Sequence, residues 1–338
     1  GRLGLQVMRL VDDQIAVLGQ HAARQHQVGE QQGVVHDHQM AALGAAEAPV
    51  LQVGLAQFLV PDFTPQPAAA AAHAGRAVLD FDAEYAREPG DRLVSGRVIR
   101  PDDIASYFHT GGTTGTPKIA RHTHANEVFM SWGVREWVGL GPGSVFLCGL
   151  PLFHVNAAIA TGLGTFCSGA AVLLAGIQGY RTPGLLAGFW RLIERYRVNY
   201  FSAVPTVYAS LLEVPVAGAD VSSLRYAVCG AAPMPPEVFR RFETLTGLRI
   251  LEGYGLTEAT CASCINPPAG ERRIGSIGLP LPYQGVKAAV VGADGKRVRD
   301  CEPEEIGVLL VSGPAVFPGY LREQDNAKIW ADEGWLNT

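Results

Sequence analysis

Apolar residues from about residue 79 onward alternate between short continuous runs and patterns with helical spacing. Short apolar runs predict buried strands at residues 144–150, 170–175, 200–204, 224–229 and 249–252. Between some of these runs, residues 185–196 and 236–245 carry apolar positions at helical spacing. Strands that alternate with helices are typical of a parallel sheet with crossover helices, so the predicted fold class is α/β.

The pattern changes after about residue 282. Residues 286–291 and 306–312 predict short antiparallel strands, and Asp294-Gly295 is typical of the tight turn after the first of them. We therefore expect an α/β core at residues 79–283 and a small, partial β subdomain at residues 284–338 that packs on it.

Residues 155–177 contain no charged side chain, and on length alone they could span a bilayer. Their many small and polar residues make transfer into lipid unfavourable, and Gly162, Gly164 and Gly169 divide the segment. A buried helix followed by a buried strand is the favoured interpretation, with a membrane span as the alternative.

The first 75 residues differ in composition from the rest of the chain. They hold 11 of the 14 Gln, five of the nine His and no Lys, and their apolar residues follow no sustained period. We expect this segment to be disordered or non-native, with a boundary near Gly75. His36-Asp37-His38 leaves a metal site there as an alternative.

Composition narrows the class of protein further. The 338 residues suggest about two domains, and 48% hydrophobic against 17% charged residues excludes general disorder. A net charge of -5 argues against a nucleic-acid partner. The six scattered Cys fit a reducing, cytoplasmic location, and Cys261 and Cys264 are interpreted as small core thiols rather than half of a redox or zinc site.

The most informative segment is Tyr-Phe-His-Thr-Gly-Gly-Thr-Thr-Gly-Thr-Pro-Lys at residues 107–118. Three Gly, four Thr and a Lys within nine positions offer backbone N–H groups, hydroxyls and a positive charge to a polyphosphate. It is not a Walker A loop, because Thr116-Pro117 separate the last Gly from Lys118 and Ile119 replaces the magnesium-binding hydroxyl. A surface loop without function is the alternative.

This segment resembles the phosphate-binding signature of the adenylate-forming (AMP-binding) enzymes, which include the acyl-CoA synthetases. Further segments resemble later motifs of that family in the same order: Leu-Pro-Leu-Phe-His at 150–154, Cys-Gly-Ala-Ala-Pro at 229–233, Glu-Gly-Tyr-Gly-Leu-Thr-Glu at 252–258, and residues 313–320 and 334–335. The resemblance covers residues 79–338 and none of the first 75. It implies the large N-terminal domain of that fold, with mostly parallel sheets and packed helices, plus an incomplete β subdomain.

The resemblance also implies a function. Members of the family activate a carboxylic acid with ATP as an acyl-adenylate and pass the acyl group to a thiol. We therefore expect an acyl-CoA synthetase-type ligase of fatty acid metabolism that uses ATP, Mg²⁺ and coenzyme A as co-substrate. Its partner would be a small-molecule carboxylic acid, without nucleic acid or stable membrane insertion, and the oligomeric state stays open.

The matching positions receive roles by the same resemblance. Phosphate binding is implied for Thr110, Gly111, Gly112, Thr113, Thr114, Gly115 and Lys118. Thr257 would donate to the α-phosphate, and Glu258 would ligate Mg²⁺. Tyr254 would cover one face of adenine, with Gly230, Ala231 and Ala232 against the other. His154 would stand at the acyl tunnel, beside walls from Val204, Pro205 and the region of Gly162.

Some of these residues have other interpretations. Tyr254 could be a half-buried core aromatic, Glu258 a helix-start carboxylate, and His154 a satisfied core histidine. His122-Thr123-His124 has metal-like spacing, but we interpret it as the entry of a helix together with Asn126.

Three departures from the family pattern stand out. Ile119 replaces the usual Gly after Lys118, and the family's N-terminal strands have no counterpart in residues 1–75. The chain stops at residues 334–338, where the family would place a ribose-binding Asp, so we expect the hinge and the lid domain with its catalytic Lys to be absent. A non-catalytic nucleotide- or acyl-binding fragment, or a pseudogene product, is therefore the alternative function. A peptide-synthetase adenylation domain would need a carrier domain downstream.

Overall fold

A computed structural model describes residues 50–52, 78–80, 87, 89, 95–110, 117–176, 178–216 and 218–338. Residues 1–49 and 53–77 lie outside this part of the chain, and with them most of the segment predicted to be non-native and the alternative metal site at residues 36–38. Five predicted phosphate-binding residues also lie outside it: Gly111, Gly112, Thr113, Thr114 and Gly115.

The larger sheet has seven strands in the order β11-β10-β9-β8-β7-β5-β6. They are β5 (Val145–Cys148), β6 (Ala171–Leu174), β7 (Tyr200–Ala203), β8 (Tyr226–Cys229), β9 (Arg249–Tyr254), β10 (Cys264–Ile265) and β11 (Leu279–Pro280). Strands β5 to β9 are parallel to one another, whereas β10 and β11 add an antiparallel edge. The predicted α/β class and its parallel strands are thus confirmed. The antiparallel strands β10 and β11 were not predicted.

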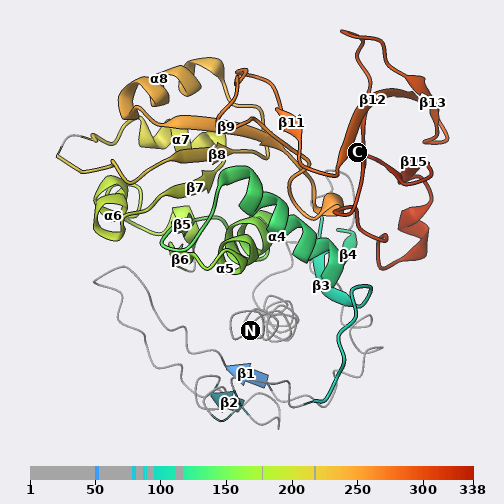
Figure 1. Cartoon of the computed structure of the whole chain (residues 1–338), viewed down its shortest axis with the longest axis horizontal. Coiled ribbons are helices and arrows are strands. Elements are labelled where there is room, and N and C mark those ends of the chain that lie inside the picture. Colours follow the sequence, from blue (N-terminus) through green and yellow to red (C-terminus); the bar gives the residue numbers. More distant parts are fainter. Residues whose placement is uncertain are drawn as a thin grey trace.

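Helices cover both faces of this sheet (Figure 1). The α-helices are α4 (His124–Val138), α5 (Gly164–Cys167), α6 (Phe189–Tyr196), α7 (Pro205–Leu211) and α8 (Pro236–Thr246). Adjacent strand residues point to opposite faces, so Leu147 and Phe201 belong to the core under α6, α7 and α8, while Phe146 and Tyr200 belong to the core under α4. Both faces are buried at the central strands β5 and β7, which explains their short apolar runs, whereas the edge strand β6 is partly exposed.

The uncharged segment at residues 155–177 is a helix followed by a strand, as predicted. It begins with the π-helix η2 (Asn156–Leu163), continues into α5 and ends with β6. Within the part of the chain that the structure describes, no helix is long and apolar enough to cross a membrane.

Two shorter pairs of strands precede the large sheet. β3 (Ile104–His109) and β4 (Ile119–Thr123) form an antiparallel hairpin, and α4 starts directly after β4. β1 (Val50–Gln52) and β2 (Val78–Asp80) pair in parallel. The segment that connects β3 to β4 is the predicted phosphate loop, so the position of this hairpin matters for function.

The C-terminal part forms a second, antiparallel sheet in the order β13-β12-β14-β16-β15. Its strands are β12 (Gly285–Val291), β13 (Arg297–Asp300), β14 (Val308–Ser312), β15 (Trp330–Asp332) and β16 (Trp335–Asn337). The two predicted strands correspond to β12 and β14, and Ile306 falls outside β14 because it is 96% exposed. The Asp294-Gly295 turn joins β12 to β13, a strand that the sequence pattern did not predict.

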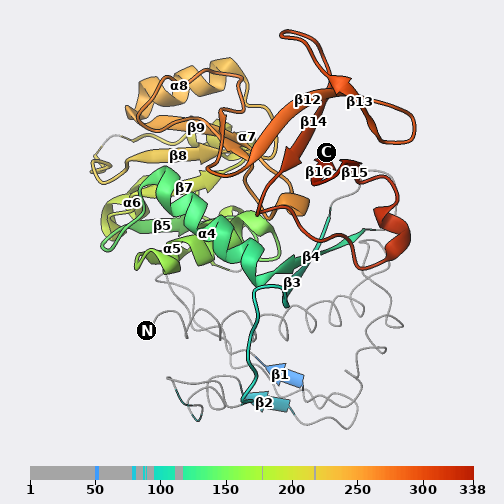
Figure 2. The same cartoon turned by 45° about the vertical axis from the view of Figure 1, so that its right-hand side comes forward.

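Residues 313–321 follow β14 of this second sheet and contact the β3–β4 hairpin. Figure 2 shows the sheet and the hairpin next to each other. The N–H of Leu321 donates to the carbonyl of Ile119 at 2.8 Å, and Ala120 and Tyr320 form a β-bridge. The side-chain amide of Asn126 donates to the carbonyls of Pro314 at 2.8 Å and Val316 at 3.1 Å. The C-terminal part therefore helps to position the hairpin.

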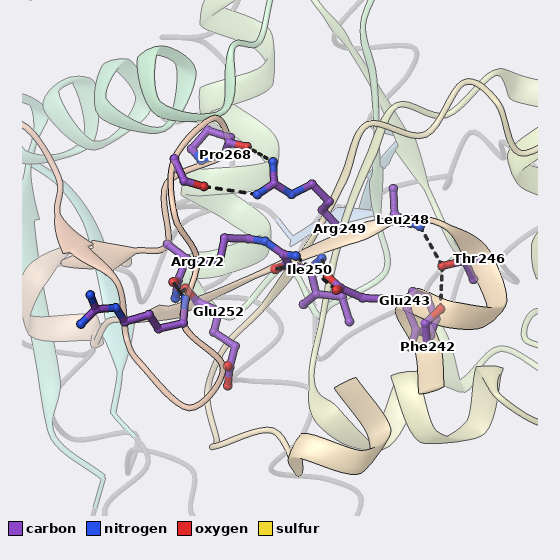
Figure 3. A network of polar contacts seen from close by, with 12 residues as sticks. Phe242, Glu243, Thr246, Leu248, Arg249, Ile250, Glu252, Pro268 and Arg272 are labelled. Carbon is purple, nitrogen blue, oxygen red and sulfur yellow. Dashed lines mark hydrogen bonds and ion pairs between the residues drawn. The ribbon is translucent and has the colours of Figure 1, made fainter. Parts of the chain in front are cut away.

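A polar network fixes β9 against α8 and the loop at residues 266–276 (Figure 3). Glu243 of α8 pairs with Arg272 and accepts the N–H of Ile250 at 2.7 Å, while Arg272 also donates to the carbonyl of Ile250 at 2.7 Å. Glu252 accepts the N–H of Gly275 at 2.8 Å. These contacts hold β9 in place, and Tyr254 is its last residue.

Candidate active site

The predicted phosphate loop connects β3 to β4. The hairpin ladder ends with the pair His109 and Ile119, and beyond it the N–H of Thr110 donates to the carbonyl of Lys118 at 2.8 Å. Thr110 is buried and Lys118 is half-buried. This hydrogen bond closes the base of the loop and brings the first and last predicted phosphate-binding residues together.

Tyr320 contacts both charged residues of the site. Its ring centroid lies 4.8 Å from Nζ of Lys118, and its hydroxyl donates a hydrogen bond to Glu258. Burial and this hydrogen bond raise the pKa of Tyr320 above its ordinary value, so the hydroxyl keeps its proton and acts as the donor. The sequence analysis gave Tyr320 no role, although its place at the end of the 313–320 motif was a signal.

Thr257 and Glu258 lie in the one-turn helix η4 (Thr257–Ala259), shortly after β9. Gly255 precedes them because a Cβ at that position would lie 1.6 Å from the carbonyl oxygen of Cys261. The carbonyl of Glu258 accepts the N–H of Phe317 at 2.9 Å. The turn is thus held between β9 and the 313–321 segment, with both side chains half-buried.

Gly230, Ala231 and Ala232 follow the end of β8, beside Tyr254 at the end of the neighbouring β9. A Cβ on Gly230 would lie 3.4 Å from the carbonyl oxygen of Gly253, which leaves little room for a side chain. Ala231 has a φ of 69°, a left-handed conformation that is uncommon for alanine. Ala231 and Ala232 are both exposed, but only Gly230 and Ala231 border the site.

A cavity of about 770 Å³ brings most of the predicted residues together. The predicted site residues that line it are Thr110, Lys118, His154, Gly230, Ala231, Tyr254, Thr257 and Glu258. Val204 lines it too, and Ala160 and Thr161 line it from the region of Gly162, as expected for the acyl side, whereas Ala232, Pro205 and Gly162 itself do not. Pro205 begins α7 on the other face of the sheet, and the Cβ direction of Gly162 points into η2, toward the carbonyl oxygen of Ala157 at 2.9 Å.

His154 is exposed as a whole residue, but neighbouring protein atoms remove part of the water around its ring. Desolvation, with a smaller effect of His109, lowers its pKa. Its Nδ1 accepts the N–H of Asn156 at 3.3 Å. A neutral ring with Nε2 protonated fits these contacts.

His122 has a place that the sequence analysis did not predict. The helix entry at Thr123 is confirmed, since the Thr123 hydroxyl accepts the N–H of Asn126 at 3.2 Å. His122 itself is fully buried in β4, and its Nε2–H donates to the carbonyl of Thr257 at 2.7 Å. Burial lowers the pKa of His122 to about 4.

Glu127 lies on the other side of the His122 ring. Its Oε1 lies 4.0 Å from Nδ1 of His122, a nitrogen without a hydrogen-bond partner among the described residues. Burial raises the pKa of Glu127 to about 7, although a hydrogen bond from the Ser106 hydroxyl acts in the opposite direction. Ser106, Glu127 and His122 therefore form a buried polar cluster. This cluster holds the turn at Thr257 in place through the hydrogen bond from His122 to the Thr257 carbonyl.

The cysteines contribute apolar surface to the site. All six are free thiols, and Cys261 and Cys264 are buried and line the cavity. Burial raises the pKa of Cys261 to about 12 and of Cys264 to about 11. The burial of Cys261 and Cys264 agrees with their interpretation as core thiols.

Comparison with known proteins places this geometry in a family. A family model described as "AMP-binding enzyme" matches residues 27–321, so the match begins well before residue 79, within a segment in which the motifs showed no resemblance. The marinolic acid–CoA ligase of Pseudoalteromonas sp. (strain SANK 73390) is 42% identical over 268 residues, which cover 77% of this chain and 40% of that protein. A long-chain-fatty-acid–CoA ligase of Bacillus subtilis is 30% identical over 75% of this chain and 44% of that protein.

Solved structures agree with these sequence relatives. The o-succinylbenzoate coenzyme A synthetase of Bacillus subtilis, in complex with ATP and magnesium ion, superimposes with a TM-score of 0.63 at 28% identity, over 78% of this chain and 52% of that chain. The chain spans about half the length of the relatives it matches. The family model nonetheless covers most of the sequence, and the chain belongs to the AMP-binding enzyme family.

Proposed function

We propose that this chain carries the site at which ATP activates a carboxylic acid as an acyl-adenylate, for later transfer to coenzyme A. The observation that carries the proposal is that three segments far apart in the sequence meet at one cavity. They contribute Lys118, Gly230, and the pair Tyr254 and Glu258. Two anions must meet in this reaction. Catalysis would therefore rest mainly on positioning and on neutralisation of charge.

The hairpin loop would hold the β- and γ-phosphates. Lys118 and Thr110 stand at its closed base, so the ammonium group and the hydroxyl face the same end of the cavity. The proposal also assigns the intervening residues to the phosphates: Gly111, Gly112, Thr113, Thr114 and Gly115. Their density of N–H and hydroxyl donors supports that role.

Thr257 and Glu258 would act at the α-phosphate. The Thr257 hydroxyl would donate to a phosphate oxygen, and the backbone of Thr257 is held by His122. The Glu258 carboxylate, oriented by Tyr320, fits a magnesium ion that is shared with substrate phosphates, since Mg²⁺ commonly binds one or two carboxylates and phosphate oxygens. Bound there, Mg²⁺ would supply neutralisation of the phosphate charge.

Tyr254 on one side and Gly230 and Ala231 on the other would hold the adenine ring. Gly230 and Ala231, which have little or no side chain, line the same cavity as the half-buried ring of Tyr254. Ala232 belongs to the predicted set but lines no part of the cavity. Neutral His154 would stand beside the bound carboxylic acid, where it places no second positive charge.

The relatives support the same class of reaction. Their names describe ligation of coenzyme A to marinolic acid and to long-chain fatty acids, and the solved structure of a coenzyme A synthetase contains ATP and magnesium. We also propose a division between the α/β core and the β subdomain at residues 283 and 284, and a cytoplasmic location, which the six free thiols favour.

Calorimetry with Mg·ATP tests the binding step. We expect Lys118→Ala to weaken binding by about 10- to 100-fold, because a hydrogen bond to a charged group contributes about 1.5–3 kcal/mol. Lys296→Ala, which changes an exposed lysine of the second sheet, is the matched control. Equal ATP affinity of Lys118→Ala and the parent chain would remove the loop from the site.

Pyrophosphate release with a panel of carboxylic acids tests the chemical step. Release that depends on the added acid would support adenylate formation by this chain. ATP binding without acid-dependent release would instead support the alternative, a non-catalytic nucleotide-binding fragment.

A further inference from the structure

The inner part of the cavity is built from the cores on one face of the large sheet. Val134 and Val138 come from the last turns of α4, Phe146 from β5, Ala160 from η2 and Ile265 from β10. α4 begins directly after β4 and extends away from the hairpin along the sheet (Figures 1 and 2). Its 15 residues span about 20 Å, so the cavity reaches deep behind the phosphate end.

Charge is confined to one end of this cavity. Among the described residues that line it, only Lys118 and Glu258 carry a full charge, and both contact Tyr320. The lining from α4, β5, η2 and β7 contributes no Lys, Arg, Asp or Glu within the described ranges. A second anionic group of a substrate would therefore find no described cation in the inner part.

The neutral polar groups of the inner part are hydrogen-bonded to one another. The Thr161 hydroxyl donates to Oδ1 of Asn156 at 3.3 Å, and Nδ2 of Asn156 donates to the Ser202 hydroxyl at 3.2 Å. These groups link η2 to β7, and none of them carries a charge that could pair with an anion. The thiols of Cys261 and Cys264 stay protonated and add apolar surface.

We propose that the inner part of the cavity selects a monocarboxylic acid with an uncharged, largely apolar acyl chain and rejects acids with a second anionic group. This inference rests on the proposed function, because it takes the charged end for the nucleotide. The physical reason is desolvation: a carboxylate that leaves water without a paired cation is strongly disfavoured, whereas each buried methylene group is favoured.

Non-hydrolysable acyl-sulfamoyl adenosines test the proposal on the complete chain, with calorimetric affinity as the measurement. We expect the hexanoyl compound to bind roughly 100-fold more tightly than the acetyl compound, given four further buried methylene groups. The adipoyl compound, which has a terminal carboxylate, should bind at least about 100-fold more weakly than the hexanoyl compound. Equal affinities of the hexanoyl and adipoyl compounds would overturn the inference and leave the proposed function standing.

Failure of the proposed function has a different signature. If neither Mg·ATP nor any of the three compounds binds, the nucleotide site itself is wrong. Binding of Mg·ATP without a preference among the compounds refutes only the acyl selectivity.

Two alanines of η2 provide matched variants. Ala160 lines the cavity, whereas Ala158 is equally buried, at 9% exposure, and does not. Ala160→Leu should reduce the preference for the hexanoyl over the acetyl compound by at least about tenfold, because the added side chain occupies the space of the acyl tail. Ala158→Leu should leave the ratio unchanged, and Mg·ATP binding verifies that each variant is folded. An unchanged ratio in Ala160→Leu would contradict the assignment of the inner cavity to the acyl chain.

Discussion

Glu127 is a buried carboxylic acid whose protonation can be measured through stability. Its pKa is about 7 in the folded chain against 4.5 for an ordinary glutamate. A raised pKa means that the folded state holds the proton more tightly than the unfolded state. The stability that Glu127 contributes is therefore present below pH 4.5 and is lost as the pH rises to about 7. Glu127→Gln removes this dependence because the amide does not titrate.

The size of the effect follows from the two pKa values. One pKa unit corresponds to about 1.4 kcal/mol, so the free energy of unfolding of the parent chain should fall by about 2.5 kcal/mol relative to Glu127→Gln between about pH 5 and about pH 8. His122 acts with the opposite sign. Its pKa is lowered from 6.5 to about 4, so its contribution to stability grows as the pH rises from about 4 to 6.5. The two groups offset each other in the parent chain, and Glu127→Gln should expose the dependence of His122.

Urea denaturation followed by tryptophan fluorescence at several pH values provides the measurement. Glu136→Gln is a suitable control, since Glu136 lies on the same helix with its side chain 45% exposed. Its free energy of unfolding should run parallel to that of the parent chain. A constant difference between Glu127→Gln and the parent chain at all pH values would refute the argument, because it would mean that Glu127 has the same pKa in both states.

Three further results are expected. Tyr320→Phe keeps the ring beside Lys118 but removes the hydroxyl that orients Glu258, so Mg·ATP affinity should fall about tenfold in calorimetry; an unchanged affinity would contradict that role. Asn126→Ala keeps the Thr123 cap but loses the hydrogen bond that the Asn126 side chain accepts from the N–H of Thr123 and two hydrogen bonds to the 313–321 segment, which should lower the free energy of unfolding by about 2–4 kcal/mol, and a loss below about 1 kcal/mol would speak against the connection. Exposed Cys167 should be alkylated well before buried Cys261, whose pKa is about 12, and peptide mapping by mass spectrometry that finds equal rates would disprove the difference.

The sequence predicted the parallel sheet well because its central strands β5 and β7 are mostly buried. A strand that is covered on both faces appears as a short apolar run rather than as an alternation of apolar and polar residues. The second sheet was predicted less completely. β15 and β16 have three residues each, too few to show a period, and their pairing depends on contacts with β14 that are distant in sequence.

The residues of the candidate site also fall into two groups, those that the sequence could predict and those that it could not. Motif residues such as Thr257 and Glu258 could be named because their spacing is local. His122 could not, since its donation to the carbonyl of Thr257 joins residues 135 positions apart and leaves no periodic signal. Ala232 shows that membership in a motif does not by itself place a residue in the site: it follows Ala231, whose φ is left-handed, and does not line the cavity.

The pairing of residues 319–321 with β4 has a consequence for the order in which the site forms. Lys118 and Ile119 reach their neighbours in the site only after about two hundred further residues have been synthesised, because Tyr320 and Leu321 supply the contacts. Contacts of such long sequence separation form late in folding. The cavity would thus mature together with the C-terminal sheet, and under the proposed function ATP, by binding only the finished cavity, would stabilise strands that it does not contact.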